Sequence, residues 1–222
     1  MSAGSVVFVR HGRTRYNAAM RLQGQVDIEL DEVGKWQATS GAQAFVLGVT
    51  PTRIVASDLD RAHATALEIA KLTGQEVGID SRLRERSFGP WEGLTRPEIE
   101  VRWPNEFALW TSGLEPNLQG METKAVVAQR MIAAIEDHSA DLSPKDTLVL
   151  VSHGAAITST LIALLGQDPA DWRGLGGLQN VHWSRISKNT AADAAPRWRL
   201  IEHNVGLSAQ HGNQAWADGI TN

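Results

Sequence analysis

Two apolar segments, far apart in the chain, each end in a histidine followed by a glycine. The first is Val6-Val7-Phe8-Val9-Arg10-His11-Gly12, and the second is Leu148-Val149-Leu150-Val151-Ser152-His153-Gly154. Short apolar runs bounded by glycine are typical of strands buried on both faces of a parallel sheet. Ligands of open α/β sheets bind beyond the carboxyl ends of the strands. We therefore expect His11 and His153 to face one common crevice.

The rest of the chain alternates predicted strands with predicted helices. Strands are expected at 5–9, 53–56, 75–79, 147–151, 181–186 and 198–202, and helices at 31–47, 123–138 and 155–165. A further helix should begin at a Ser57 or Asp58 cap and end at Gly74. This alternation predicts an α/β fold, a three-layer α/β/α sandwich around a mostly parallel sheet.

Other segments carry no clean period. We expect a loop or broken helix at 12–27, a loop or lid at 81–95, a tryptophan-bearing helical insert at 97–110, turns at 115–120 and weak order at 208–222. The predicted organisation is a single domain over residues 1–222, with a helical and loop insert at about 86–122 that covers the active site. Trp91, Trp103 and Trp110 lie in this insert and serve either as packing or as a platform for a sugar.

Composition narrows the class of protein. The 222 residues are 42% hydrophobic, which is enough for a full core, and the net charge of −4 argues against nucleic acid or an anionic membrane as the partner. The absence of cysteine excludes disulfides, thiolate zinc sites and a cysteine nucleophile. No apolar stretch approaches the roughly 20 residues that span a bilayer, and no signal sequence precedes the first strand, so we expect a cytoplasmic protein.

The predicted strand ends bring cations to one edge of the sheet. Arg10, His11, Arg61 and His153, with a helix that begins after Gly154, make a pocket suited to a dianion such as a phosphoryl group. Phosphoryl transfer depends mostly on positioning and on neutralising the charge of the equatorial oxygens.

The same inventory suggests how a phosphoryl group could be transferred. The carboxylates needed to hold Mg²⁺ are not obviously assembled, and a neutral imidazole is nucleophilic near pH 7 without a separate base. A departing alkoxide needs a proton, and Glu85, in the loop after the third predicted strand, is the first candidate donor. Asp58, Glu92 and Asp60 are the alternatives.

Six motifs together resemble the histidine phosphatase (phosphoglycerate mutase-like) superfamily and follow that family's order over about the first two-thirds of the chain. They are Arg10-His11-Gly12, Asn17, the run 22–30 (LQGQVDIEL), the run 57–62 (SDLDRA), Leu83-Arg84-Glu85 and Ser152-His153-Gly154. Each is weak alone, and the set is specific. The resemblance implies a phosphoglycerate mutase-like fold and a reaction that uses no metal and no cofactor.

The resemblance also implies roles for individual residues. His11 would become phosphorylated, Arg10, Arg61 and His153 would hold the phosphoryl oxygens, and Glu85 would act first as proton donor and then as base for water. The further predicted phosphate contacts are Asn17, Gln23, Gly24 and Gly154. Relatives of this kind often form homodimers, and we expect a small phosphorylated substrate.

Hydrolysis is favoured over mutase activity. The cofactor-dependent mutases typically carry an acid directly after the Arg-His-Gly tripeptide, where this chain has Arg13, and a longer insertion late in the chain. The segments 171–180 (DWRGLGGLQN) and 197–200 (RWRL) are more narrowly similar to glucosyl-3-phosphoglycerate phosphatases. We therefore expect hydrolysis of glucosyl-3-phosphoglycerate to glucosylglycerate, an intermediate toward methylglucose polysaccharides, with Arg13 as a hypothetical contact to the glycerate carboxylate.

Several other functions stay open. A phosphoglycerate mutase or a broad-specificity sugar or phosphoglycerate phosphatase would use the same pocket, and a phosphoester-binding module would keep the pocket without turnover. A haloacid dehalogenase-type enzyme would use Asp58 as its nucleophile, but Arg61-Ala62 replaces the expected Gly-Thr and no later acidic pair follows. A metal hydrolase built on His11 and His153 lacks any His-x-x-x-His or Asp-x-His spacing.

Overall fold

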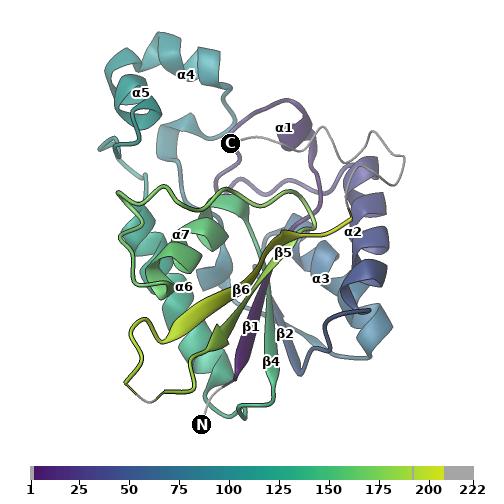
Figure 1. The fold of residues 1–222 in the computed structure, drawn as a ribbon. Coiled ribbons are helices and arrows are strands. Elements are labelled where there is room, and N and C mark those ends of the chain that lie inside the picture. The colour runs from purple at the N-terminus through teal and green to yellow at the C-terminus, as the bar shows by residue number, and fades with distance from the viewer. Residues whose placement is uncertain (1–2, 192, 208–222) are drawn as a thin grey trace.

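A computed structural model describes residues 3–191 and 193–207 of the chain (Figure 1). A six-stranded sheet in the order β3-β2-β4-β1-β5-β6 forms its centre. The strands are β1 (Ser5–Arg10), β2 (Arg53–Ala56), β3 (Val77–Ile79), β4 (Thr147–Ser152), β5 (Trp183–Lys188) and β6 (Trp198–Val205). Only β5 is reversed among them, since it pairs antiparallel with β1 and β6 while the other pairs are parallel. The mostly parallel sheet is confirmed.

The two glycine-terminated apolar runs are adjacent strands at the centre of this sheet. β1 and β4 pair in parallel with Val6 opposite Leu148 and Arg10 opposite Ser152. Because the register is level, His11 and His153 follow the two strands at the same height and leave the sheet side by side. The pairing of two segments that are distant in sequence is what creates the site.

Helices cover both faces of the sheet, because successive apolar side chains of each central strand point to opposite faces and both sets must be buried. Val7 and Val9 pack with α2 (Glu32–Phe45) and α3 (Asp60–Thr73), whereas Val6 and Phe8 pack with α6 (Lys124–Ser139) and α7 (Gly154–Leu164). Figure 1 shows α2 and α3 on one side of the sheet and α6 and α7 on the other. The three-layer α/β/α sandwich is therefore confirmed.

Helix ends follow the sequence signals with one exception. Asp31 caps α2, Thr123 caps α6, and Gly74 ends α3 in the left-handed conformation with φ 69°. The predicted cap of α3 is wrong: Leu59 occupies that position and provides no side-chain bond. Asp58 instead accepts hydrogen bonds from the Arg84 guanidinium, a charge-assisted contact that is stronger than one to a backbone N–H.

The insert lies over the carboxyl edge of the sheet. It contains α4 (Arg96–Arg102) and α5 (Pro104–Thr111), which Figure 1 shows beyond the strand ends on the same side as α1 (Arg15–Ala18). The expected helical character of 97–110 is confirmed, and the segment is divided into two helices because Pro104 excludes the α conformation at Trp103, where φ is −137° and ψ is 63°. The loop at 81–95 holds two short 3₁₀ turns, Ser81–Leu83 and Gly89–Trp91.

A separate hydrophobic cluster holds the insert together. Trp91 and Ile99 are fully buried, and the Trp110 ring packs edge-on against Trp91 with ring centroids 5.6 Å apart. Leu22 and Ala155, which belong to the body of the protein, pack against this cluster. Trp91 is thus packing rather than a surface for a sugar.

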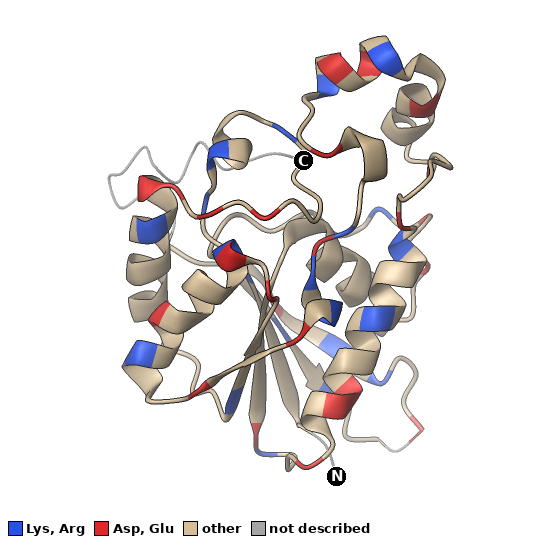
Figure 2. Ribbon diagram, turned by 180° about the vertical axis from the view of Figure 1, so that it is seen from behind, with Lys and Arg blue, Asp and Glu red and all other residues tan. Residues whose placement is uncertain are grey.

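The outer surface carries both signs of charge. Figure 2 shows basic and acidic residues interleaved along the helices that flank the sheet. Over residues 3–191 and 193–207, no helix has both the length and the apolar character to cross a membrane. The predicted weak order of 208–222 falls outside the residues that the structure describes.

Candidate active site

Two buried histidine rings meet at the ends of the central strands. The centroids of His11 and His153 are 5.0 Å apart with 58° between the ring planes, and the residues are 2% and 0% exposed. His11 follows β1, and His153 is the N-cap residue of α7, which continues from β4. The two imidazoles that the sequence placed at one edge are therefore in contact.

The hydrogen bond of His11 defines which of its nitrogens is reactive. Nδ1 lies 2.6 Å from the carbonyl oxygen of Gly12, and a carbonyl can only accept, so Nδ1 carries the proton. Nε2 of a neutral ring then keeps its lone pair. Burial, followed by the positive charges of Arg61 and Arg10, lowers the pKa of His11 well below its usual value. The same burial and Arg61 lower the pKa of His153.

Two buried guanidinium groups flank the rings. Arg61 donates to the carbonyl oxygens of Val26 at 2.8 Å and Gly24 at 2.9 Å, and Arg10 donates to that of Leu178 at 2.5 Å. Burial lowers the pKa of Arg61 to about 10, so the group is cationic at neutral pH. These carbonyls fix the direction of each guanidinium but do not neutralise its charge.

Four buried nitrogens of this group have no hydrogen-bond partner among the described residues. They are Nε of Arg10, Nε of Arg61, and Nδ1 and Nε2 of His153. Buried polar atoms without partners are rare in folded proteins and are costly. Two of them are N–H donors of cationic side chains, and a neutral His153 ring contributes one more donor. The arrangement can bind a compact anion.

Glu85 is held next to His153 by the start of α7. Its carboxylate accepts from the backbone N–H groups of Ala155 at 3.1 Å, Ala156 at 2.8 Å and Arg86 at 2.8 Å. Because Ala155 and Ala156 are the second and third residues of α7, Glu85 satisfies two otherwise unpaired donors of the helix. The structure thus places a carboxyl group within the same cluster as the two imidazoles and two guanidiniums.

Arg130, on α6, anchors the backbone that carries Glu85. Its guanidinium donates to the carbonyl oxygens of Arg82, Arg84 and Glu85 at 2.6–2.9 Å and forms an ion pair with Glu122 at 2.9 Å. Sequence reasoning placed Arg130 in the apolar phase of a helix but gave it no role. An arginine in the core-facing stripe of a helix was the available signal.

The smaller polar contacts form a framework on the other side. Asn17 and Gln23 are buried, and their side-chain oxygens accept from Thr14, so both amides are fixed in direction. Gly24 has φ 53°, and a β-carbon there would collide with the carboxylate of Glu92. Gly154 begins α7 where its backbone faces Arg10.

Some predicted residues have other partners. Arg13 donates to Asp31 at 2.9 Å at the start of α2. Of the alternative acids, Asp58 is paired with Arg84, which lowers the pKa of its carboxyl, and Glu92 accepts from the backbone of Gln25 and Phe88. Asp60 begins α3, with its backbone N–H bound to Asp27. Glu85 is the candidate acid that contacts the start of α7.

Sequence reasoning gave no separate role to Asn180, which contacts the backbone of His11. Its Nδ2 donates to the carbonyl oxygen of His11 at 2.8 Å, and the next residue, Val181, donates its N–H to the carbonyl of Arg10. Val181 has φ 57°, a left-handed conformation that is strained for a β-branched residue. Asn180 ends the segment 171–180 that resembles known phosphatases, which was the available signal.

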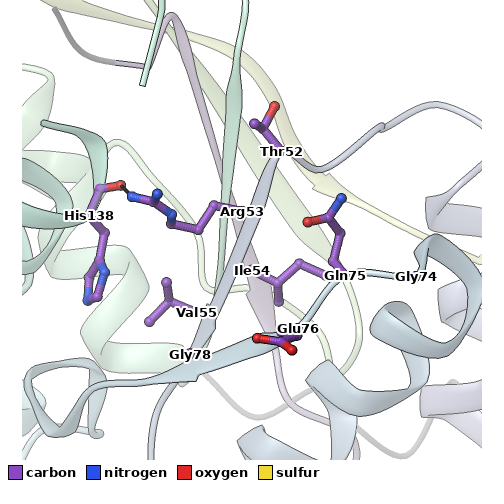
Figure 3. Close-up of a pocket in the computed structure, with 9 residues that line it drawn as sticks. All are labelled: Thr52, Arg53, Ile54, Val55, Gly74, Gln75, Glu76, Gly78 and His138. Atoms are coloured by element: carbon purple, nitrogen blue, oxygen red, sulfur yellow. Dashed lines mark hydrogen bonds between the residues drawn. The ribbon is translucent and has the colours of Figure 1, made fainter. Parts of the chain in front are cut away.

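Two further features lie apart from this cluster. Within the described part of the chain, no three His, Asp or Glu side chains gather closely enough to hold a metal ion. Figure 3 shows a cavity of about 460 Å³ that includes none of the predicted site residues. It is lined by Thr52, Arg53, Ile54, Val55, Gly74, Gln75, Glu76, Gly78 and His138.

Comparison with known proteins agrees with this geometry. The chain is 37% identical over 216 residues to a glucosyl-3-phosphoglycerate phosphatase of Mycobacterium tuberculosis, covering 92% of this chain and 96% of the relative. It is 38% identical over 198 residues to a protein of Yersinia enterocolitica named probable phosphoglycerate mutase GpmB, covering 87% and 89%.

Solved structures show the same architecture. A mycobacterial glucosyl-3-phosphoglycerate phosphatase in complex with VO3 matches with a TM-score of 0.78 and 36% identity, over 90% of this chain and 98% of that one. The model of the histidine phosphatase superfamily (branch 1) matches residues 6–200. Since this match covers most of the chain, including both strand-end histidines, the protein belongs to the histidine phosphatase superfamily.

Proposed function

We propose that the protein is a phosphomonoesterase that works through a phosphohistidine on His11. In the first step Nε2 of His11 attacks phosphorus, the N–P bond forms, and the P–O bond to the alcohol breaks. A protonated Glu85 gives its proton to the departing oxygen. In the second step the Glu85 carboxylate takes a proton from water, the new P–O bond forms, and the N–P bond breaks to release phosphate and neutral His11.

The cluster of unpartnered nitrogens carries this proposal. Nε of Arg10, Nε of Arg61 and a ring nitrogen of His153 surround the reactive histidine, where they would meet the charge on the equatorial oxygens. The backbone at Gly24 accepts from Arg61, and that at Gly154 lies beside Arg10; Asn17 and Gln23 stay predicted phosphate contacts. Because both guanidiniums are held by backbone carbonyls, they need no rearrangement as the charge develops.

We further propose glucosyl-3-phosphoglycerate as the substrate, with glucosylglycerate as the product. Two relatives with this activity in their names, from Mycobacterium tuberculosis and Mycolicibacterium vanbaalenii, are 36–37% identical and are covered over 96–99% of their length. Coverage of this extent includes the insert and the segment 166–180, where substrate contacts outside the phosphoryl pocket would lie.

Acid-labile labelling tests the covalent step. Protein mixed with a ³²P-labelled phosphomonoester and quenched in alkali should carry label on His11, and His11→Gln should abolish both label and turnover. His63→Gln, on α3, is the control and should keep both. Label that persists in His11→Gln would contradict the proposal. Turnover should also continue in EDTA, because the predicted mechanism uses no metal; loss that Mg²⁺ restores would contradict it.

The substrate is tested by comparing kcat/KM for glucosyl-3-phosphoglycerate, 3-phosphoglycerate and an unrelated sugar phosphate. Glucosyl-3-phosphoglycerate should exceed both by at least ten-fold, and equal values would support a broad-specificity phosphatase. The relative named as a probable phosphoglycerate mutase gives a second candidate, which predicts conversion of 3- to 2-phosphoglycerate. Binding without turnover of any ester would leave a phosphoester-binding module. The homodimer and the cytoplasmic location stay predictions, to be tested by light scattering and by fractionation.

A further inference from the structure

Lys124 is a cation in the core-facing stripe of α6. It is the first residue of the helix, and the buried Val127, Ala128 and Met131 follow it at the spacing of one helical face. Its side chain therefore continues the core stripe toward the carboxyl edge of the sheet. Lys124 is half-buried, and no acidic side chain lies within ion-pair distance of its ammonium among the described residues.

The surroundings of Lys124 are basic. Burial, and then the charges of Arg173 and Arg86, lower the pKa of Lys124. Glu115, the nearest acid on the insert, accepts from the Arg86 guanidinium at 2.9 Å and from the backbone N–H of Lys124 at 2.9 Å. Its charge is therefore shared between Arg86 and Lys124, whose pKa it raises against the effect of burial and the two arginines. Asp171 is the other acid nearby, and it forms no ion pair with Lys124.

The cation cluster adjoins the phosphoryl pocket on two sides. Arg86 follows Glu85 directly, and the Glu85 backbone is held by Arg130, two turns below Lys124 on α6. Arg173 donates to the carbonyl oxygen of Gly113 in the insert, while Leu178, five residues later, accepts from Arg10. The segment that carries Arg173 therefore runs from the insert to the guanidinium beside His11.

Three effects make this a costly place for a lysine. The ammonium is partly desolvated, it faces two guanidiniums, and it sits at the positive end of a helix dipole. A local conflict of this kind is expected where a residue serves function. Arg13, the cation first considered for the substrate carboxylate, is already paired with Asp31. Lys124 forms no such ion pair within residues 3–191 and 193–207.

We propose that Lys124, supported by Arg173, binds the carboxylate of a phosphoester whose phosphoryl group lies at His11. This inference rests on the proposed function, because it requires an ester bound in the strand-end pocket. It names the substrate class as phosphorylated hydroxy acids, in which a carboxylate and a phosphoryl group lie a few bonds apart. An anionic second group is the feature that such a cation selects.

The test compares two ligands that differ only in that group. 3-Phosphoglycerate carries the carboxylate, and glycerol 3-phosphate has a hydroxymethyl group in its place. Lys124→Met should lower kcat/KM for 3-phosphoglycerate about ten-fold, mainly through KM, and change glycerol 3-phosphate less than two-fold. Lys124→Arg should restore most of the selectivity. Lys145→Met, an exposed lysine before β4, is the matched control and should change neither value.

Calorimetric binding of the same two ligands separates the two proposals. If wild-type protein hydrolyses neither of these esters nor glucosyl-3-phosphoglycerate, the proposed function fails, and Kd for each ligand still reports whether Lys124 contacts the carboxylate. An unchanged ratio between the two ligands in Lys124→Met overturns the inference, by turnover or by binding. An equal loss for both ligands also overturns it, because the residue would then act on the shared pocket or on folding.

Discussion

At the scale of single residues, the two histidines at the site are held in their neutral form. Burial lowers the pKa of both rings, and the nearby guanidiniums lower it further, because a third and fourth positive charge would repel them. A neutral ring is what a nucleophile requires at His11. Because the folded state resists protonation of these rings while the unfolded state does not, acid favours unfolding.

Stability should therefore fall in mild acid. An unfolded histidine has a pKa near 6.5, so the contribution of each depressed histidine is fully present above about pH 6.5 and is lost as pH falls toward the folded pKa. The free energy of unfolding should decline by up to about 1.4 kcal/mol per pH unit for each such ring. Urea titrations from pH 7.5 to 5 measure this slope.

Burial also lowers the pKa of His182 and His203, so a variant must isolate the site. His153→Gln should lower the slope of the free energy of unfolding against pH by the contribution of about one bound proton. His63→Gln, on α3, should leave this slope unchanged. An identical slope in His153→Gln and wild-type protein would mean that His153 binds protons equally in the folded and unfolded states, so that its pKa is not lowered by the fold.

The role of Glu85 depends on the alcohol that leaves. Glu85→Gln should cut kcat by roughly 10²–10³ for an alkyl phosphate, whose alkoxide needs a proton, and far less for p-nitrophenyl phosphate, whose phenolate leaves unaided. Both carboxylate oxygens accept from α7, and Gln keeps only one acceptor, so the free energy of unfolding should also fall, by about 1–3 kcal/mol and equally for assays with either ester. Equal losses on the two substrates would argue that Glu85 only orients the helix. Steady-state rates with both esters decide this.

The site residues that the sequence located are those fixed by strand ends. His11, His153 and Arg10 follow from apolar runs that stop at glycine, and a short helical turn brings Arg61 to the same edge. Asn180 could not be found this way. Its contact with the His11 carbonyl depends on the strained turn at Val181, and a β-branched residue is the type least expected at positive φ.

At the scale of elements, one arginine connects the helix α6 to the loop that carries the acid. Arg130 donates to three carbonyls of that loop, at Arg82, Arg84 and Glu85, and pairs with Glu122. A planar guanidinium can satisfy all of these acceptors at once, whereas an ammonium cannot reproduce the fork.

Removing this anchor should affect both folding and rate. Arg130→Met should lower the free energy of unfolding by about 3 kcal/mol, because the carbonyls and Glu122 lose a partly buried donor. We expect kcat to fall as Glu85 loses its fixed position, and Arg130→Lys to recover little of either. Lys71→Met removes an exposed ion pair on α3 and should change stability by less than about 1 kcal/mol. If Arg130→Met changes neither the free energy of unfolding nor kcat, Arg130 does not anchor the loop.

Element boundaries were predictable where a local interaction sets them. The Asp31 and Thr123 caps and the Gly74 end required only their own neighbours in sequence. The start of α3 was not predictable, because Asp58 pairs with Arg84 from a distant loop. The split between α4 and α5 was marked in the sequence by Pro104, because the residue before a proline is disfavoured in the α conformation.

At the scale of the whole molecule, the site lies between a rigid sheet and an insert with its own cluster of apolar side chains. The sheet supplies the histidines and arginines, while the insert supplies Glu115 and borders Lys124. The two similar runs predicted that both histidines face one crevice, but not that β1 and β4 are neighbours in the sheet. The packing of the insert was not predicted either, since aromatic residues in an irregular segment fit either a core or a ligand surface.

Trp91 is the residue on which the packing of the insert depends. It is fully buried among Phe88, Ile99 and Trp110, and Leu22 and Ala155 join this cluster to the body. Trp91→Ala should remove about 3–5 kcal/mol of packing. Because the sheet has separate clusters on its two faces, this loss should fall on the insert.

Limited trypsin digestion can locate that loss, since α4 carries Arg102, whereas Arg96 is followed by Pro97 and resists trypsin. Cleavage at Arg102 should accelerate at least ten-fold in Trp91→Ala, while Arg61, buried on α3, stays protected; Trp36→Ala, on α2, should not expose α4. If residues 1–222 are instead one domain that opens only as a unit, Arg61 and Arg102 will be cut at the same rate, and urea unfolding will keep a single transition. The faster cut at α4 is the outcome we expect, because Leu22 and Ala155 are the only apolar side chains of the body that join the insert cluster among the described residues.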